Sequence, residues 1–179
     1  MDDPKQFKVV FLGENYVGKT VLIDSFINGY FSDTSYTTVS SSYITKTINH
    51  GNKNYNFDIW DTPGYVRYRS LMKLFLKDAN IIVLIYDTTE ESTFLELDYW
   101  INTILTKNNP EVSFILVGNK SDLFENEKIR EEDAVKFAEI LNAKFSLISV
   151  KENPWGWRDF LENSFIDYIK NFAIEMDLL

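Results

Sequence analysis

Short apolar runs alternate with amphipathic stretches along the whole chain. The apolar runs are rich in β-branched and aromatic residues, which is typical of buried strands. The amphipathic stretches repeat apolar residues every three or four positions, as helices with one buried face do. Strands are predicted over Phe7–Leu12, Tyr43–Ile48, Tyr55–Trp60, Ile81–Tyr86, Phe114–Val117 and Phe145–Ser149, and helices over Lys19–Asn28, Thr93–Leu105, Glu131–Asn142 and Asp159–Phe172.

This alternation predicts a single α/β domain over residues 1–179. A strand–helix–strand order builds a mostly parallel sheet with helices on both faces. The exception is Asn49-His50-Gly51-Asn52, a polar turn between two strands in which His50 is expected to be a simple turn residue. Such a turn predicts a hairpin, and therefore one antiparallel edge strand in the sheet.

The stretch Gly13–Thr20 carries the strongest chemical signal. It has the spacing G-x-x-x-x-G-K-[ST] of a phosphate-binding loop, and it lies between a predicted strand and a predicted helix, as such loops do. Backbone N–H groups of the loop and of the helix N-terminus would face an anion. Lys19 would reach the phosphates, and the Thr20 hydroxyl would bind Mg²⁺. The alternative, a glycine turn with a solvated lysine, is disfavoured by the flanking strand and helix.

A second motif, Trp60-Asp61-Thr62-Pro63-Gly64, follows the third predicted strand. Asp61 stands where a carboxylate would hold Mg²⁺ through water, because Mg²⁺ keeps much of its hydration shell. Gly64 would let a backbone N–H approach the terminal phosphate closely. Alone, this sequence is more often an ordinary turn, so its interpretation depends on the phosphate loop.

A third motif, Asn119-Lys120-Ser121-Asp122, comes directly after another predicted strand. The Asp122 carboxylate would accept hydrogen bonds from N1–H and the exocyclic amine of guanine, a donor pair that adenine lacks. Lys120 would cover the base with its aliphatic stem. A solvated turn is the alternative. If Asp122 binds guanine in this way, the site would select guanine over adenine, which argues against a phosphate-loop kinase or ATPase.

Composition removes several other classes. The net charge is −9, from 18 basic and 27 acidic residues, which argues against nucleic acid or anionic lipid as a direct partner. The absence of cysteine excludes a disulfide framework, a thiolate metal site and lipidation of a cysteine in this sequence. The longest apolar run, Ile81–Tyr86, is too short to cross a bilayer, and the acidic N-terminus is no signal peptide. A cytoplasmic protein is expected.

In this order, the three motifs resemble those of Ras-superfamily small GTPases, nearest the Rab branch. The resemblance extends from about Phe7 to Phe172 and includes Ser25–Phe31, Tyr86–Thr89, Phe114–Leu123 and Ser149–Lys151. It implies the three-layer P-loop GTPase fold with a six-stranded sheet, bound GDP or GTP with Mg²⁺, and a molecular switch in vesicle traffic. It also implies effector proteins that bind the switch segments, an exchange factor and a GTPase-activating protein as partners.

The resemblance assigns roles to individual residues. Thr38 would bind Mg²⁺ only when the γ-phosphate is present, and Phe31 would lie against the guanine. The backbone at Val150, where relatives usually have alanine, would donate to the guanine carbonyl. An effector-binding triad is implied at Tyr43, Trp60 and Phe75, with plain core packing as the alternative. The implied metal ligands are Thr20, Thr38 and Asp61. The implied catalytic residues are Lys19, Thr38, Gly64 and Tyr65. The implied nucleotide-binding residues are Asn15, Tyr16, Val17, Gly18, Lys19, Thr20, Val21, Phe31, Thr38, Gly64, Asn119, Lys120, Asp122, Ser149, Val150 and Lys151.

The chain departs from the family at the hydrolytic centre. Tyr65 stands where active members have a glutamine that orients the attacking water, and the only glutamine here, Gln6, precedes the first strand. Slow intrinsic GTP hydrolysis is therefore predicted, with a nucleotide-loaded scaffold that recruits partners as the alternative function. Tyr16 occupies a usually small position, where its ring would shield the γ-phosphate or displace an incoming arginine.

Two further features are left with alternatives. Rab-like proteins usually end in prenylated cysteines, whereas this sequence ends in Glu175–Leu179. Attachment to the cytosolic face of an endomembrane is therefore expected only through a lipidated tail or second domain outside this sequence. Trp155 and Trp157, placed before the last predicted helix, look like a local insertion that is either core or an added contact surface.

Overall fold

The computed structural model describes residues 4–32, 42–64, 74–105 and 112–177, and it contains every predicted strand and helix. Most element ends lie within two residues of the prediction, and a short 3₁₀ helix, η2, is an addition. The strands are β1 (Lys5–Leu12), β2 (Ser42–His50), β3 (Lys53–Asp61), β4 (Ile81–Asp87), β5 (Ser113–Asn119) and β6 (Lys144–Leu147), and the helices are α1 (Lys19–Asn28), α3 (Glu91–Leu105), η2 (Ser121–Asn126), α4 (Glu131–Ile140) and α5 (Pro154–Asp177).

The strands form one six-stranded sheet in the order β2-β3-β1-β4-β5-β6. All neighbours pair in parallel except β2 and β3, which are antiparallel, so the predicted hairpin and edge strand are confirmed. His50 is the last residue of β2 and pairs with Lys53 rather than lying in the turn. The turn is Gly51–Asn52, and both residues have positive φ, as a two-residue hairpin turn requires.

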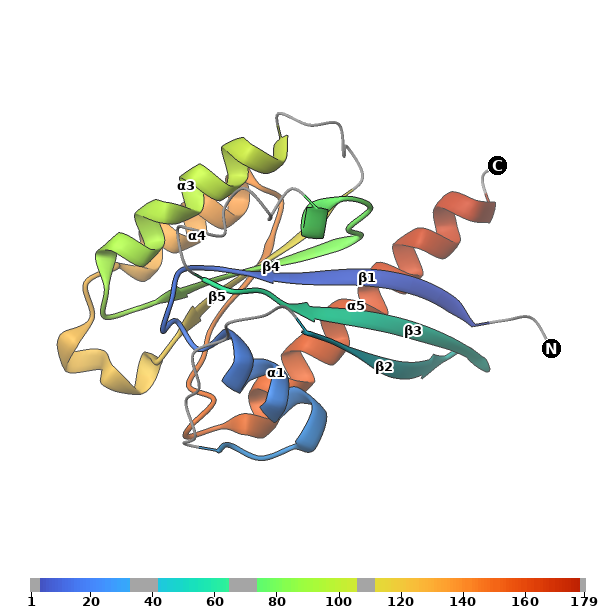
Figure 1. The fold of residues 1–179 in the computed structure, drawn as a ribbon, viewed down its shortest axis with the longest axis horizontal. Helices are drawn as coiled ribbons and strands as arrows, with labels where there is room; N and C mark the ends of the chain where they lie inside the picture. Colours follow the sequence, from blue (N-terminus) through green and yellow to red (C-terminus); the bar gives the residue numbers. More distant parts are fainter. Residues whose placement is uncertain (1–3, 33–41, 65–73, 106–111, 178–179) are drawn as a thin grey trace.

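Two apolar cores lie on opposite faces of the sheet, because successive side chains of a strand point to opposite sides. Figure 1 shows α1 and α5 on one face and α3 and α4 on the other. Val9, Phe11 and Val83 belong to the core under α1 and α5, whereas Val10 and Leu84 belong to the other core. Both faces are thus covered, as the continuous apolar runs in the central strands predict.

The start of α5 corrects the prediction for the two tryptophans. The helix begins at Pro154, so Trp155 and Trp157 lie in its first turns and not before it. Trp157 is 1% exposed, donates its indole N–H to the Leu22 carbonyl at 2.8 Å, and meets Phe11 edge-on. Trp155 is 61% exposed. One tryptophan is therefore core that joins α5 to α1, and the other is surface.

Replacing Trp157 with phenylalanine is expected to lower the free energy of unfolding by about 2 kcal/mol. The change leaves a void in the core and removes the indole N–H that donates to the Leu22 carbonyl. Urea unfolding at one fixed, saturating nucleotide concentration measures the loss. Trp155→Phe, in the same helical turn, is the matched control and should change stability by less than about 0.5 kcal/mol. Equal losses in both variants would contradict the core assignment.

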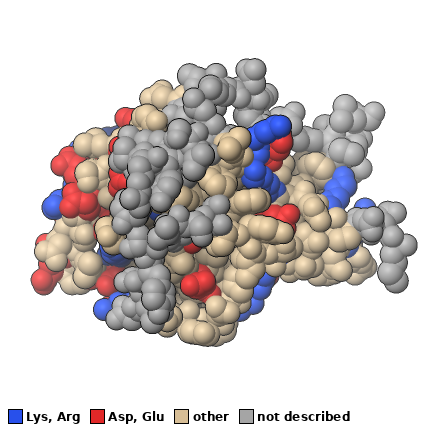
Figure 2. Space-filling view, in the orientation of Figure 1, with Lys and Arg blue, Asp and Glu red and all other residues tan. Residues whose placement is uncertain are grey.

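The described surface is electrically mixed. Figure 2 shows acidic and basic side chains interspersed over the visible face, with no continuous basic area among the residues that it colours. Within the described ranges, no helix combines the length and the apolar character that crossing a bilayer needs.

Candidate functional site

The predicted motifs meet at one edge of the sheet. The strands β1, β3, β4, β5 and β6 run parallel, so their carboxyl ends lie side by side. Open α/β sheets bind ligands at this edge. In Figure 1 it is the end of the sheet nearest the start of α1, opposite the end where β1 begins and α5 finishes. The three predicted motifs lie at the ends of β1, β3 and β5 and in the segments that follow them.

The loop between β1 and α1 has the backbone that a phosphate cradle needs. Gly18 precedes α1 with a φ of 97°, a left-handed conformation that favours glycine. A Cβ there would also lie 2.4 Å from Nδ2 of Asn119, so no side chain fits. α1 begins directly after this glycine, and the N-terminus of a helix is where backbone N–H groups bind anions.

Lys19 is buried inside this loop. Its ammonium donates to the Gly13 and Glu14 carbonyls at 2.9 and 2.8 Å. Burial lowers the pKa of Lys19 to about 8, although the nearby carboxylates of Asp61 and Glu14 partly oppose the shift. The ammonium is thus held by neutral oxygens in a dry place, where a phosphate would be a stronger acceptor.

The two predicted magnesium ligands that the structure describes, Thr20 and Asp61, are in contact. The Thr20 hydroxyl donates to Oδ2 of Asp61 at 2.6 Å. The end of β3 is fixed beside the loop because the Thr62 hydroxyl donates to the Phe11 carbonyl, also at 2.6 Å. A hydroxyl and one carboxylate fit Mg²⁺, which takes oxygen ligands and completes its shell with water and phosphate. The described residues contain no group of three His, Cys, Asp or Glu side chains that could hold a metal ion.

Gly64 and Tyr16 border the phosphate loop. A Cβ on Gly64 would lie 2.6 Å from the Asn15 backbone nitrogen, so the second motif is pressed against the loop. Tyr16 has a φ of 64°, unusual for a residue with a Cβ, and its side chain is 71% exposed. Thr38 and Tyr65 lie outside the described residues, so their predicted roles stay predictions.

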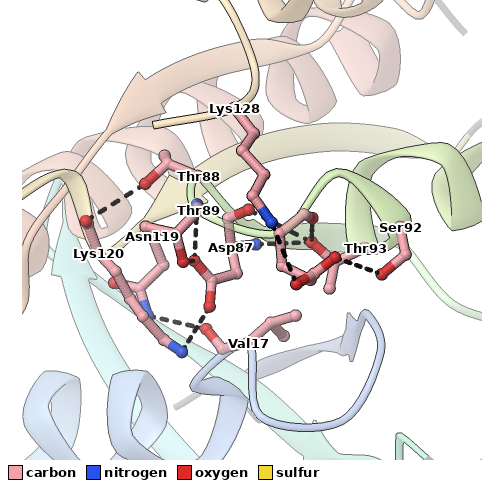
Figure 3. Close-up of polar contacts among 10 residues, drawn as sticks. Val17, Asp87, Thr88, Thr89, Ser92, Thr93, Asn119, Lys120 and Lys128 are labelled. Carbon is pink, nitrogen blue, oxygen red and sulfur yellow. Dashed lines mark hydrogen bonds and ion pairs between the residues drawn. The ribbon is translucent and has the colours of Figure 1, made fainter. Parts of the chain in front are cut away.

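The third motif is bonded to the loop. Nδ2 of Asn119 donates to the Val17 carbonyl at 2.8 Å, while its buried Oδ1 has no hydrogen-bond partner among the described residues. An N–H of a bound ligand, or a water, would satisfy that acceptor. The Lys120 ammonium donates to Oδ2 of Asp87 at 2.5 Å, as Figure 3 shows. The Ser121 backbone N–H donates to the Ile148 carbonyl at 3.0 Å, which ties the motif to the segment after β6.

The structure also describes the remaining predicted nucleotide contacts. Ser149 and Val150 are buried directly after β6, whereas Lys151 is exposed. Asp122 is half-buried at the start of η2. Phe31 and Val21 are half-buried against the core under α1 and α5. The segment after β6 therefore lies beside the third motif, and the predicted nucleotide contacts of Phe31 and Val21 stay predictions.

The three predicted effector residues form one aromatic cluster. Tyr43 of β2 stacks on Trp60 of β3 at 5.1 Å between ring centroids, and Trp60 lies 6.0 Å from Phe75. Trp60 and Phe75 pack partly on the core under α3, whereas Tyr43 is 62% exposed. The core-packing alternative therefore describes Trp60 and Phe75, Tyr43 faces outward, and effector binding by the cluster stays a prediction.

The residues at the end of β4 carry no motif from which a role could be predicted. Asp87 accepts from the Thr89 backbone N–H and hydroxyl, and its own N–H donates to the Thr93 hydroxyl. The available signal was a carboxylate at the carboxyl end of a buried strand, the same signal that identified Asp61. No motif spacing linked Asp87 to Lys120, so only the fold brings them together.

Comparison with known proteins agrees with this arrangement. The family model described as "Ras family" matches residues 8–170. The chain is 35% identical over 164 residues to Ras-related protein Rab-21 of Mus musculus, covering 92% of this chain and 72% of the relative. The match to Ras-related protein Rab-21 of Homo sapiens has the same identity and length and covers 92% of this chain and 71% of the relative.

Proposed function

The chain belongs to the Ras family of small GTPases, and from this premise we propose that it binds GDP and GTP with Mg²⁺ and acts as a switch in vesicle traffic. One observation carries the proposal. The buried Lys19 ammonium, the Thr20–Asp61 pair and the Asn119–Val17 bond lie along a single sheet edge. An elongated ligand bound along this edge would meet a group for its phosphates, then the metal ligands, and then the base motif.

The phosphate end uses fixed donors. Lys19 would exchange its two loop carbonyls for β- and γ-phosphate oxygens, a stronger charge-assisted bond. Thr20 and Asp61 would hold Mg²⁺, the threonine directly and the carboxylate through water, and the ion would neutralise phosphate charge. Backbone N–H groups of Asn15 to Gly18 and the α1 N-terminus would complete the cradle.

The base end supplies selectivity. Asp122 would accept the two donors on the Watson–Crick edge of guanine, Lys120 would lie along the ring, and Asn119 would keep this motif at a fixed distance from the phosphate loop through Val17. Adenine would leave the half-buried Asp122 carboxylate without its two donors, which costs more than a missing contact.

The switch follows from which contacts need the γ-phosphate. Thr38 and the Gly64 backbone N–H would bind the γ-phosphate side, so hydrolysis would release both segments. The close approach of Gly64 to Asn15 supports this assignment, because a side chain there would keep the two backbones apart. Effectors would then distinguish the two states next to the aromatic cluster of Tyr43, Trp60 and Phe75.

Slow hydrolysis is part of the proposal. Tyr65 replaces the glutamine that would orient water, and a phenol does not reproduce the geometry of an amide. The exposed Tyr16 ring stands at the loop where an arginine from a partner would enter. A scaffold that stays loaded with nucleotide is the second candidate, favoured by the outward-facing Tyr43 of the aromatic cluster.

Replacing Tyr65 with glutamine is expected to speed single-turnover hydrolysis of bound GTP by about tenfold or more. The glutamine amide would hold the attacking water in line with the bond that breaks. The protein is loaded with GTP, and released phosphate is followed with time. Tyr99→Gln on α3, far from the nucleotide, is the matched control and should leave the rate unchanged. An unchanged rate in Tyr65→Gln would contradict the assignment of Tyr65, and a wild-type protein that cannot be loaded with GTP would overturn the proposed function.

A further inference from the structure

A partly buried charge pair beside the base motif joins the ends of two neighbouring strands. The Lys120 ammonium lies 2.5 Å from Oδ2 of Asp87, and the two side chains are 34% and 9% exposed. Asp87 ends β4, whereas Lys120 follows β5, so the pair crosses between neighbouring strand ends (Figure 3). A partly buried pair with this geometry restrains the lysine stem far more than solvent would.

The carboxylate of Asp87 is itself held in one orientation. Its Oδ1 accepts from the Thr89 backbone N–H at 2.9 Å and from the Thr89 hydroxyl at 2.7 Å. Burial favours the neutral acid, but the hydrogen bonds from Lys120 and Thr89 outweigh it, so the pKa of Asp87 lies below its ordinary value. Oδ1 is thus occupied by Thr89, and Oδ2 is directed at Lys120.

The same loop also holds the backbone of Lys120. That residue has a φ of 65° and a ψ of 33°, a left-handed conformation that is strained for a residue with a Cβ. Its carbonyl accepts from the Thr88 hydroxyl at 3.2 Å and from the Leu123 N–H at 3.0 Å. The segment after β4 therefore fixes both ends of Lys120, its main chain through Thr88 and its ammonium through Asp87.

We propose that Asp87, oriented by Thr89, is a positioning residue that holds the Lys120 stem across the face of the bound guanine and thereby sets how long GDP stays bound. The inference rests on the proposed function, since it concerns the same nucleotide site. When the carboxylate is removed, the left-handed lysine relaxes, its stem leaves the ring, and the base exchanges with solvent more often.

A second charge pair, near the first in the chain, provides a control for the loss of the Asp87 carboxylate. Lys128 and Glu90 lie 3.6 Å apart, and their side chains are 55% and 52% exposed. Exposed pairs of this kind contribute little. Glu90→Gln makes the same acid-to-amide change as Asp87→Asn, three positions along the chain, without touching Lys120.

The experiment is a double-mutant cycle on GDP release, with a fluorescent GDP chased by excess unlabelled GDP at fixed Mg²⁺ and salt. Asp87→Asn should raise the release rate about tenfold, and Lys120→Met should do the same. In the Lys120→Met background, Asp87→Asn should add less than twofold, because coupled residues are not additive. Glu90→Gln should change nothing. If Asp87→Asn fails to fold, Thr89→Val takes its place in the cycle, with an expected threefold increase.

Multiplicative effects in the cycle would overturn the inference, because they would mean that Asp87 acts on stability without involving Lys120. An unchanged release rate in Asp87→Asn, or an equal increase in Glu90→Gln, would also overturn it. In each of these cases wild-type protein still binds GDP, so the proposed function stands. Failure of the wild type to bind GDP would overturn both.

Discussion

Lys19→Met should lower the affinity for GDP by at least about 100-fold. Methionine keeps the apolar stem and the buried volume but removes the charge that would bind the β-phosphate. A desolvated charge-assisted bond of this kind contributes about 3–5 kcal/mol, and each 1.4 kcal/mol is a factor of ten. Isothermal titration of nucleotide-free protein with GDP, at fixed Mg²⁺ and salt, measures the change.

Lys8→Met is the matched control for this variant. The Lys8 ammonium also donates to a backbone carbonyl, that of Lys77, at 2.8 Å, and Lys8 belongs to the same strand that leads into the loop. Its loss should leave GDP affinity within about twofold. A Lys19→Met protein that binds GDP normally would contradict the phosphate assignment. Thermal unfolding without nucleotide separates lost binding from lost folding.

Asp122→Ala should reduce the preference for GDP over ADP by about 1,000-fold or more. In the proposed complex the wild-type carboxylate would accept the two donors of guanine and would lack both with adenine, and sites built to hydrogen-bond a ligand in this way discriminate by about 10⁴–10⁵. Alanine removes both the attraction for guanine and the penalty for adenine, so the two affinities should approach each other. Competition of each nucleotide against a fluorescent GDP measures the ratio.

Glu125→Ala is the control for Asp122→Ala, since Glu125 is an exposed carboxylate on the same short helix, η2. It should leave the ratio of GDP to ADP affinity unchanged. A preference for GDP that survives in Asp122→Ala would place base recognition elsewhere. A variant that loses both nucleotides equally would indicate a damaged phosphate site instead.

The sheet and the three motifs could be predicted because their signals are local. Continuous apolar runs mark strands covered on both faces, and the side-chain alternation within them assigns Val9 and Val10 to opposite cores. Each motif is a short contiguous stretch that directly follows a strand, so the parallel order of the sheet is enough to bring the motifs to one edge. The glycine motif can be identified as a phosphate-binding loop because a strand precedes it and a helix follows it.

The start of α5 shows where local reading fails. Pro154 occupies the first helical turn, where its missing N–H costs nothing, but a following Trp-Gly-Trp does not have the apolar spacing of a helix. The helix forms because Trp157 can be buried between α1 and β1 and can donate to Leu22, 135 positions earlier. Packing supplies the stabilisation that propensity lacks.

Patterns of neighbouring residues were enough to predict the elements, the parallel sheet with its one antiparallel hairpin, and the residues that would meet phosphate, metal and base. The contacts between side chains that lie far apart in the chain became visible only in the folded protein. It paired Thr20 with Asp61 across 41 positions and Lys120 with Asp87 across 33, and it stacked Tyr43 on Trp60. Motifs and periodicity are properties of neighbouring residues, whereas these contacts depend on strand order, register and rotamer, which are fixed only when the whole core packs.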